Sequence, residues 1–514
     1  MAATEYEYDC VVVGSGHAGS CAALAAVDAG VKRILVIDKC PEEWAGGNGY
    51  FTAGAHRTVH RGLDDLISII SGSEVEKKRG EIDVSPYTAE DFRNDIMRLG
   101  GGKSDKDLVD AVVQGSWDTV LWLAKRVGIP FTLSFNRQAY LVDGRQKFWG
   151  GMALSVQDGG KGLIAAHRRE LNHAGVETWF DTTAVQLLRE NDAISGIVVQ
   201  KKETPLQIKA RAVILACGGY EASAQLRRKH LGPQWEKAKA SDGIHLATSI
   251  GAALAGDFSE TGCHSTCWDA DAPSDRGDQV LTNQFTKSGY PLGLMLNAHG
   301  NRFVDEGADF RNYTYAKYGR AILQQPGGYA FQVFDQAVLD HLREEEYAPT
   351  VVRRIWADSL EELAEKLRPE GLEDKVKFLQ TIEEYNKSVV ASFDERPSRR
   401  WDPAIKDDCS TQSQSLSLAI PKSNWALRIK DGPFMAVKVT CGITFTFGGL
   451  AVNPETAEVL SEETRAPIKG LYGCGELVGG LFYFNYPGGS GLTAGAVLGR
   501  KAGTEVGKMM GMVV

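Results

Sequence analysis

The stretch Tyr8-Asp9-Cys10-Val11-Val12-Val13-Gly14-Ser15-Gly16-His17-Ala18-Gly19 decides how this chain folds. Its apolar half predicts a buried strand, and the alanine-rich segment after it predicts a helix. Because Gly14 and Gly16 have no side chain, the backbone can turn tightly and approach a pyrophosphate, while Gly19 lets the helix pack closely on the strand. A second predicted strand ends at Asp38, nineteen residues after Gly19, where a carboxylate can accept hydrogen bonds from a ribose. The stretch therefore predicts a dinucleotide-binding unit.

A second glycine-rich stretch lies at the far end of the chain, Gly470-Leu471-Tyr472-Gly473-Cys474-Gly475-Glu476 followed by Tyr486-Pro487-Gly488-Gly489-Ser490-Gly491. We interpret the two stretches as halves of one cofactor site. A helix predicted to begin near 490–492 directs its N-terminus at that site, where its partial positive charge stabilises negative charge on a ligand. The two ends of the chain are therefore expected to meet in one nucleotide-binding unit.

The composition is typical of a soluble globular protein, with 514 residues, 43% hydrophobic and 24% charged, and a net charge of −9. This length predicts two domains. The acidic balance argues against nucleic acid or a membrane as partner, and no apolar run reaches the length of a membrane span. Nine cysteines without a spacing framework, and no secretory signal at the start, indicate a reducing, cytoplasmic compartment. Cys263 and Cys267 lack further ligands at matching spacing, so no metal site is predicted.

The order of predicted elements indicates an α/β fold that is interrupted by an insertion. Apolar spacing predicts helices from Asp105 to Gly128, over Gly162–Ala174 and from about Ser241 to Gly251. Residues 263–440 change character, with more aromatic and long polar segments, before the glycines of the second stretch return. We therefore assign residues 1–262 and 441–514 to the nucleotide-binding domain, and residues 263–440 to an inserted α+β capping domain.

Five motifs occur in the order of one known superfamily. They are the opening fingerprint, Gly46-Gly47-Asn48 with Thr52-Ala53-Gly54, Val213-Ile214-Leu215-Ala216-Cys217-Gly218-Gly219, Arg302-Phe303-Val304-Asp305-Glu306, and the closing stretch from Gly470 to Gly499. With them the chain resembles the FAD-dependent fumarate reductase/succinate dehydrogenase flavoprotein superfamily over nearly its whole length. Residues 439–449 and 482–491 are most similar to the tricarballylate dehydrogenase-like flavoproteins, and Tyr486-Pro487-Gly488 is also similar to the ketosteroid dehydrogenases.

The resemblance implies a Rossmann-type, glutathione-reductase-like FAD-binding domain with an inserted cap. The residues it assigns to FAD binding are Gly14, Gly16, His17, Ala18, Gly19, Asp38, Lys39, Gly46, Gly47, Asn48, Thr52, Ala53, Gly54, Ala184, Val185, Ala216, Cys217, Gly218, Gly475, Glu476, Gly489, Ser490, Gly491 and Leu492. In succinate dehydrogenases a histidine just before the Gly-Gly loop tethers the flavin. Here the segment 39–45 has no histidine, so FAD is expected to bind without a covalent bond.

The superfamily interconverts CH–CH and C=C bonds next to carboxylates, with hydride transfer at flavin N5 and an acid/base on the opposite face. The resemblance places the cap histidine on His264 and the cap glutamate on Glu306, with Arg311 in the same polar cluster. Three positions depart from the pattern. Val338-Leu339 and Tyr486 replace two arginines, and Thr440-Cys441-Gly442 replaces a histidine. Fumarate and succinate are therefore not the expected substrates.

Tyr486 is the main candidate that these departures leave. The likeness to ketosteroid dehydrogenases gives it the role of hydrogen-bond donor to a substrate carbonyl, and the alternative is a tyrosine buried for packing. His56 and Arg57 follow the loop expected under the flavin, where they are candidates for substrate contact and for a carboxylate clamp, or for a more distant role. Tyr313 and Tyr315, beside Arg311, are candidates for proton transfer or for the core.

Together these inferences predict an FAD-dependent dehydrogenase or ene-reductase that acts on a CH–CH or C=C bond next to a carbonyl or carboxylate. A flavin oxidase or hydroxylase that uses molecular oxygen is one alternative, and a non-catalytic FAD-binding protein is another. The expected partner is a small carboxylic acid or ketone, with no nucleic acid and no membrane. The sequence leaves the electron partner open.

Overall fold

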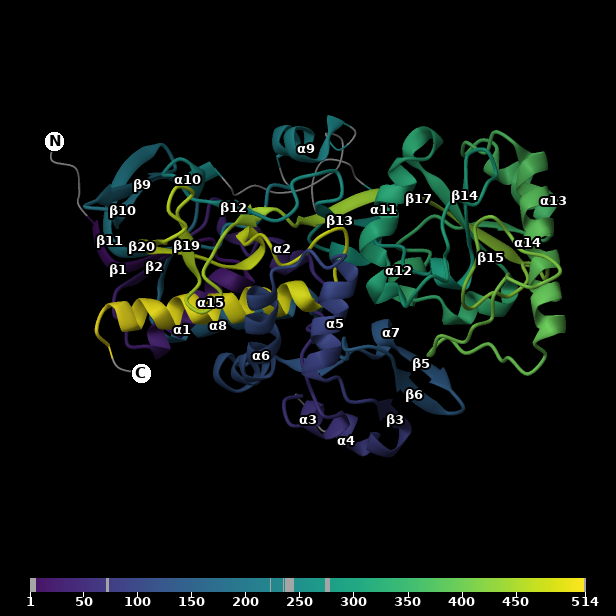
Figure 1. Ribbon diagram of the computed structural model, residues 1–514, viewed down its shortest axis with the longest axis horizontal. Coiled ribbons are helices and arrows are strands. Elements are labelled where there is room, and N and C mark those ends of the chain that lie inside the picture. Colours follow the sequence, from purple (N-terminus) through teal and green to yellow (C-terminus); the bar gives the residue numbers. More distant parts are fainter. Residues whose placement is uncertain are drawn as a thin grey trace.

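A computed structural model describes residues 6–70, 74–221, 223–233, 235, 245–272 and 278–512. The molecule is elongated, with one sheet toward each end (Figure 1). The larger sheet has the order β19-β20-β10-β11-β1-β2-β8, and β9 pairs with β10. Its strands are β1 (Tyr6–Val13), β2 (Ile34–Ile37), β8 (Glu177–Trp179), β9 (Thr182–Glu190), β10 (Ala193–Lys201), β11 (Thr204–Leu215), β19 (Glu458–Leu460) and β20 (Pro467–Gly473). Because β11 runs parallel to both β1 and β20, the two ends of the chain share one sheet.

Two helices follow the two glycine-rich stretches and pack against each other. They are α1 (His17–Asp28) and α15 (Ser490–Met509), which lie side by side under the large sheet (Figure 1). Both helices present small residues at their contact. A Cβ added to Gly499 would lie 2.5 Å from the Ala18 carbonyl oxygen, and one added to Gly503 would lie 2.2 Å from that of Ala22. This contact brings the two glycine-rich stretches together in the structure.

Further helices cover the same unit. The helix predicted from Asp105 to Gly128 is observed as α6 (Lys106–Trp122), continued by a wider turn over Leu123–Val127 and ended by Gly128 at φ 73°. The next prediction is observed as α8 (Gly159–His173). The third falls partly outside the described residues, and α10 spans His245–Thr248. The other helices here are α2 (Asn48–Phe51), α3 (Leu63–Ile67), α4 (Glu74–Lys77), α5 (Ala89–Leu99), α7 (Phe135–Gln138) and α9 (Ala224–Leu231).

The second unit contains a sheet of order β13-β17-β15-β14, with β16 paired to β17. Its elements are β13 (Cys263–Asp269), β14 (Leu294–Asn297), β15 (Ala330–Phe334), β16 (Ile355–Ala357) and β17 (Phe434–Thr446), with helices α11 (Tyr315–Leu323), α12 (Glu344–Tyr347), α13 (Leu360–Leu367) and α14 (Lys375–Glu395). Two hydrophobic cores pack on opposite sides of this sheet, one under α13 and α14 and one under α11. The domain boundary predicted at residue 440 falls inside β17.

Short pairings complete the fold. They are β3 (Ile82–Val84) with β6 (Arg145–Phe148) and β5 (Ala139–Val142), β4 (Phe131–Leu133) with β7 (Leu154–Val156), and β12 (Leu254–Ala255) with β18 (Gly449–Leu450). In the described part of the chain, none of the helices combines the length and the hydropathy that crossing a bilayer requires.

The contact between α1 and α15 gives a test of the fold. Replacing a helical glycine by alanine ordinarily stabilises a helix by about 1 kcal/mol. At Gly503 the added methyl group meets backbone atoms of α1, at 2.2 Å from Ala22 O and 2.7 Å from Ala26 N. We therefore expect Gly503→Ala to destabilise the protein by about 1–3 kcal/mol, measured by thermal unfolding, and to lower the FAD content of the purified protein.

The matched control is Gly80→Ala, because a Cβ at Gly80 has no heavy atom within 4 Å. This variant is expected to keep the melting temperature and FAD content of the parent protein. An unchanged or higher melting temperature for Gly503→Ala would contradict the packing described above.

Candidate active site

A cavity of about 810 Å³ runs along the seam where the two glycine-rich stretches, β9, β17 and α11 meet. Most of the residues predicted to bind FAD line it, namely Gly14, Gly16, His17, Ala18, Asp38, Lys39, Gly46, Gly47, Asn48, Thr52, Ala53, Ala184, Ala216, Cys217, Gly218, Gly475, Glu476, Gly489, Gly491 and Leu492. Gly19, Gly54, Val185 and Ser490 do not line it: Gly19 and Gly54 pack against backbone, Val185 is exposed, and the Ser490 hydroxyl donates to Pro487 O.

The turn between β1 and α1 fits a pyrophosphate. Gly14 has φ 108°, and a Cβ there would lie 2.4 Å from Ala216 O, so the turn requires glycine. The N-terminus of α1 then faces the cavity with free backbone N–H groups. Asp38 accepts hydrogen bonds from Ser15 N at 3.0 Å and from Ser15 Oγ at 2.6 Å. It therefore holds the turn in shape, besides lining the cavity where a ribose hydroxyl was predicted.

A second polar cluster on the cavity joins Asn48, Glu476 and a residue that the sequence did not single out, Glu221. Asn48 Nδ2 donates to Glu221 Oε1 at 2.9 Å and to Glu476 Oε2 at 3.2 Å, while Thr446 N donates to Glu476 Oε1 at 2.8 Å. Burial raises the pKa of both carboxyl groups, and the neighbouring Glu476 raises the pKa of Glu221 further. The pair therefore holds a proton that two separate surface carboxylates would release.

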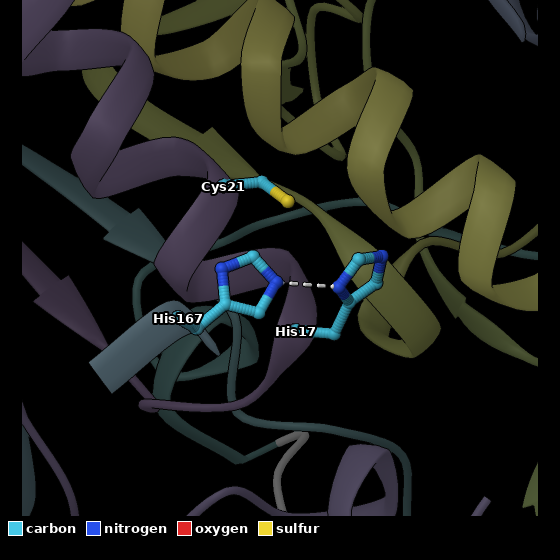
Figure 2. A group of neighbouring side chains, drawn as sticks. All are labelled: His17, Cys21 and His167. Carbon is cyan, nitrogen blue, oxygen red and sulfur yellow. Dashed lines mark hydrogen bonds between the residues drawn. The ribbon is translucent and has the colours of Figure 1, made fainter. Parts of the chain in front are cut away.

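Three buried histidines cluster at the start of α1, where His17 itself lines the cavity and His56 and His167 do not. His17 Nδ1 and His167 Nε2 are 2.8 Å apart in a hydrogen bond, and the His56 ring lies 5.3 Å from the His17 ring. In Figure 2 the two bonded rings face each other beside Cys21, and their outer nitrogens point apart. Burial lowers the pKa of His17 well below its usual value, and those of His56 and His167 to about 4 and about 3. All three imidazoles are therefore neutral near pH 7.

The same group has the residue types of a metal site, since ligand atoms of His17, Cys21 and His167 lie within 4.8 Å of one another. A metal needs the thiolate form of cysteine. Burial raises the pKa of the Cys21 thiol well above its usual value, and a shared hydrogen already joins the two imidazoles. The arrangement therefore suits a neutral hydrogen-bonded pair packed behind the cofactor cavity.

Two predicted catalytic residues lie off the cavity. His56 is fully buried behind His17, with Nδ1 hydrogen-bonded to Gly54 O at 3.0 Å. Arg57 is also fully buried, and its guanidinium donates to Gly488 O at 2.8 Å and Tyr87 Oη at 2.8 Å. Arg57 therefore anchors the loop before α15. Its Nη2 has no hydrogen-bond partner, but the residue does not line the cavity.

Glu306 is also outside the cavity. It forms a buried ion pair with Arg302, which lies four residues before it in the chain, and it accepts a hydrogen bond from Met295 N at 2.9 Å. The guanidinium of Arg302 also donates hydrogen bonds to the carbonyl oxygens of Ile420 and Pro421. The motif residues at 302 and 306 therefore fasten β14 to the segment that returns toward β17.

His264, Tyr315 and Tyr486 come together on the cavity wall. The two phenol hydroxyls are hydrogen-bonded to each other, and the His264 ring lies 4.6 Å from the Tyr315 ring and 5.1 Å from the Tyr486 ring. Burial raises the pKa of Tyr315 to about 12 and that of Tyr486 well above its usual value. His264 Nδ1 bonds the Thr444 hydroxyl, Nε2 has no partner, and burial lowers the pKa to about 3. The cluster therefore offers neutral donors and one open imidazole nitrogen.

Arg311 lines the cavity from the turn before α11 and is 7% exposed. Its guanidinium stacks over Trp149 at 5.5 Å, but within the described part of the chain it makes no side-chain hydrogen bond and no ion pair. Burial lowers its pKa, and the charge of Glu346 acts in the opposite direction. Next to it, both amide atoms of buried Asn312 lack hydrogen-bond partners. Sequence reasoning missed Asn312, as it missed Arg137 and Arg343 on the same wall.

Comparison with known proteins identifies the family. A model of the FAD binding domain family matches residues 82–492. A probable fumarate reductase from Shewanella frigidimarina is 28% identical over 97% of this chain and 74% of the relative. An NADH:fumarate oxidoreductase from Klebsiella pneumoniae is 27% identical over 98% of this chain, which spans 48% of that relative's length. A solved flavocytochrome c3 fumarate reductase in its open conformation matches with a TM-score of 0.68 and 25% identity, over 98% of this chain and 78% of that one.

These matches confirm the superfamily that the sequence motifs predicted, together with its fold and its cofactor, FAD. The residues found on the cavity fit that cofactor. The glycine turn and the N-terminus of α1 suit the pyrophosphate, and the start of α15 brings a second helix N-terminus to the same cavity.

The buried histidines predict how stability depends on pH. Histidine has an ordinary pKa of 6.5, and in the folded protein that of His56 is lowered to about 4. Between these values the unfolded chain binds a proton that the folded one does not, so stability is lost as the pH falls. We expect His56→Gln to reduce the drop in melting temperature between pH 7 and pH 4.5 relative to the parent protein.

The contribution of His56 is isolated by comparing how steeply the melting temperature falls with pH in the variant and in the parent protein. Glu221 and Glu476, whose pKa values are raised, act in the opposite direction, but they do so equally in both proteins. The control is His173→Gln, whose side chain is 81% exposed and is expected to leave the slope unchanged. Equal slopes for His56→Gln and the parent protein would show that His56 is not held neutral.

Proposed function

Because this chain belongs to the FAD binding domain family, we propose that it acts as an FAD-dependent oxidoreductase on a CH–CH or C=C bond next to a carbonyl or carboxylate. The proposal rests on one observation: Arg311 and the Tyr315–Tyr486 phenol pair face the same cavity as the dinucleotide fingerprint. A buried cation without an ion pair, beside neutral phenols, suits a substrate that develops negative charge on oxygen. Two relatives that are named for fumarate reduction support this reaction class.

FAD supplies hydride transfer when bound. We propose that it is held without a covalent bond, since residues 39–45 contain no histidine. Its binding groups on this chain are the α1 and α15 N-termini and the Asn48–Glu221–Glu476 cluster. This cluster offers fixed acceptors and a shared proton, which suits recognition of hydroxyl groups.

Each residue on the opposite side of the cavity has a separate role in this proposal. The Arg311 guanidinium binds the substrate oxygen and stabilises enolate-like charge. Tyr486 Oη, hydrogen-bonded to Tyr315, donates the proton to the carbon that does not receive hydride when a C=C bond is reduced. Because their pKa values are raised, both phenols keep their protons at neutral pH. The open Nε2 of neutral His264 accepts a hydrogen bond from substrate or water.

Three predicted residues receive no direct part in the chemistry. Arg57 and Glu306 are positioning residues, since Arg57 holds the loop at Gly488 and Glu306 orients Arg302. His56 packs behind His17. For the location we propose the cytoplasm, supported by nine cysteines that are all free thiols.

Replacing the tyrosine on the cavity tests the proposal. We expect Tyr486→Phe to bind FAD fully but to lower the rate of flavin oxidation by substrate about 10²–10⁴-fold, the usual contribution of a general acid. The measurement mixes dithionite-reduced enzyme anaerobically with trans-cinnamate, 2-cyclohexen-1-one or fumarate, and follows the return of flavin absorbance.

The control is Tyr329→Phe, whose hydroxyl donates to Gly371 O outside the cavity. Parent-like rates are expected for that variant. If Tyr486→Phe reacts as fast as the parent protein with FAD bound, the tyrosine is a packing residue. If no member of the panel oxidises the parent flavin, the proposed reaction class is contradicted.

A further inference from the structure

We propose that the substrate carries a single carboxylate, bound by Arg311 and Asn312, on an apolar aromatic body. In chemical terms it is an aryl-substituted α,β-unsaturated monocarboxylate, or the saturated acid for the reverse direction. A dicarboxylate would not fit. This inference rests on the proposed function and adds the class of substrate to it.

Two of the three arginines that line the cavity are paired with carboxylates, while the Asp278 carboxylate on the same lining accepts hydrogen bonds from Val280 N and Leu281 N. Arg137 pairs with Glu345 at 2.7 Å and with Glu346 at 3.5 Å, and Arg343 pairs with Glu346 at 3.4 Å. Glu346 is fully buried and also accepts a hydrogen bond from Ser288 N at 2.8 Å. Of the three arginines that line the cavity, only Arg311 has no carboxylate partner among the described residues.

One free cation matches one substrate anion. A second carboxylate in the same cavity would lack an unpaired arginine, and burying an unpaired carboxylate is strongly unfavourable. It would also lie near Glu346, whose charge already acts on Arg311. The charge balance therefore selects a monocarboxylate over a dicarboxylate such as succinate.

An unpartnered amide marks where the carboxylate binds. Asn312 follows Arg311 in the same turn, is 1% exposed, and has neither a donor nor an acceptor for its side chain. The unpaired Oε1 of buried Gln138 is an acceptor, which suits a donor group on a ligand and not its carboxylate. All three residues line the cavity. Because buried polar groups are nearly always hydrogen-bonded, unpaired groups beside an unpaired arginine indicate a polar ligand, and Asn312 Nδ2 can donate to a carboxylate held by Arg311.

The carboxylate site lies close to the phenol pair, because a Cβ added at Gly488 would be 3.1 Å from Tyr315 Cε1 and 3.2 Å from Asn312 Cβ. The positive charge of Arg311 acts on the Tyr315 hydroxyl, together with the charges of Arg57 and Arg137. Tyr315 and Arg311 also belong to one short segment, the turn over Arg311–Tyr313 and the start of α11. A C=C bond conjugated to the bound carboxylate would therefore lie next to Tyr315 and Tyr486, the proposed proton donors.

Aromatic side chains also line the cavity, beside polar ones such as Asn283, Thr286 and Ser288. Phe445 stacks on His264 with centroids 5.4 Å apart and meets the edge of Tyr486 at 4.9 Å. Trp268 and Phe285 form a second pair at 5.7 Å, and Met152 lies on the same lining. Aromatic faces and edges bind an aromatic ring better than they bind a second ionised group. The body attached to the carboxylate is therefore apolar and aromatic.

Ligand binding to the oxidised holoenzyme tests this class without requiring turnover. The probes are 3-phenylpropanoate, its neutral analogue 4-phenyl-2-butanone, and succinate, each titrated while the flavin difference spectrum is recorded. We expect 3-phenylpropanoate to bind at least about tenfold more tightly than the other two. Arg311→Gln is expected to weaken its binding about 100-fold, the loss of a buried charge-assisted pair, and to leave the ketone within about threefold.

Folding of the variants is checked separately. Because Arg311→Gln removes a buried cation that has no carboxylate partner, the melting temperature is expected to stay equal or rise. Asn312→Asp places a carboxylate beside Arg311, and is expected to abolish binding of 3-phenylpropanoate by pairing with the arginine. The control variant is Arg354→Gln. Arg354 is a cap arginine that does not line the cavity, and its guanidinium stacks over the Trp356 ring at 5.3 Å. This variant should bind all probes as the parent protein does.

The outcomes separate the two proposals. Tighter binding of succinate, equal binding of acid and ketone, or unchanged binding by Arg311→Gln would overturn the monocarboxylate inference. If fumarate oxidises reduced enzyme faster than trans-cinnamate, the inference fails while the proposed function stands. If 3-phenylpropanoate binds through Arg311 but trans-cinnamate does not oxidise the flavin, the ligand class stands and the proposed function fails.

Discussion

The close packing of α1 on α15 is the constraint on which the rest of this structure depends. The two helices begin at the two glycine-rich stretches, at His17 and at Ser490, which lie far apart in the sequence. They can approach only because glycines on α15 face backbone atoms of α1. That approach brings two helix N-termini and the ends of β1, β11 and β20 to one edge of the sheet. The Thr493 hydroxyl adds a hydrogen bond of 2.7 Å to Arg57 O, which ties the start of α15 to the loop after the first motif.

The charged side chains of the cavity are not all paired, in contrast to the closely packed backbone around it. Ion pairs elsewhere in the cap are complete, as at Arg302–Glu306 and Arg353–Glu370. Arg311 is buried without such a partner, and a protein gains no stability from that arrangement. Sites that store an unpaired charge or unpaired amides in this way are characteristic of ligand binding, because the ligand completes the hydrogen bonds.

Local turn chemistry explains why the cofactor half could be predicted from the sequence. Gly14 and Gly218 both adopt positive φ, a conformation that the neighbouring residues of each motif require. The motif alone is therefore sufficient to place these glycines on the cavity. Glu306 shows the limit of a motif. Its spacing from Arg302 is that of an i,i+4 pair, but only the packing of β14 decides that the pair faces away from the cavity. Arg137 and Glu221 depend on contacts over long sequence separations, with Glu346 and Asn48. Arg343 pairs with Glu346 three residues away and Asn312 follows Arg311, but no local pattern marks either of them as a cavity residue.

Tyr486 connects these two halves of the molecule. Its backbone belongs to the loop before α15, whose neighbouring Gly488 is held by Arg57, while its hydroxyl bonds Tyr315 on α11 of the cap. An arginine at this position would add a second cation opposite Arg311 and would change the charge that the cavity accepts from one to two. With tyrosine here, the position supplies a proton donor and an aromatic face instead. In the function that we propose, the residue at 486 and the unpaired Arg311 are therefore coupled, because together they set how many carboxylates a substrate can carry.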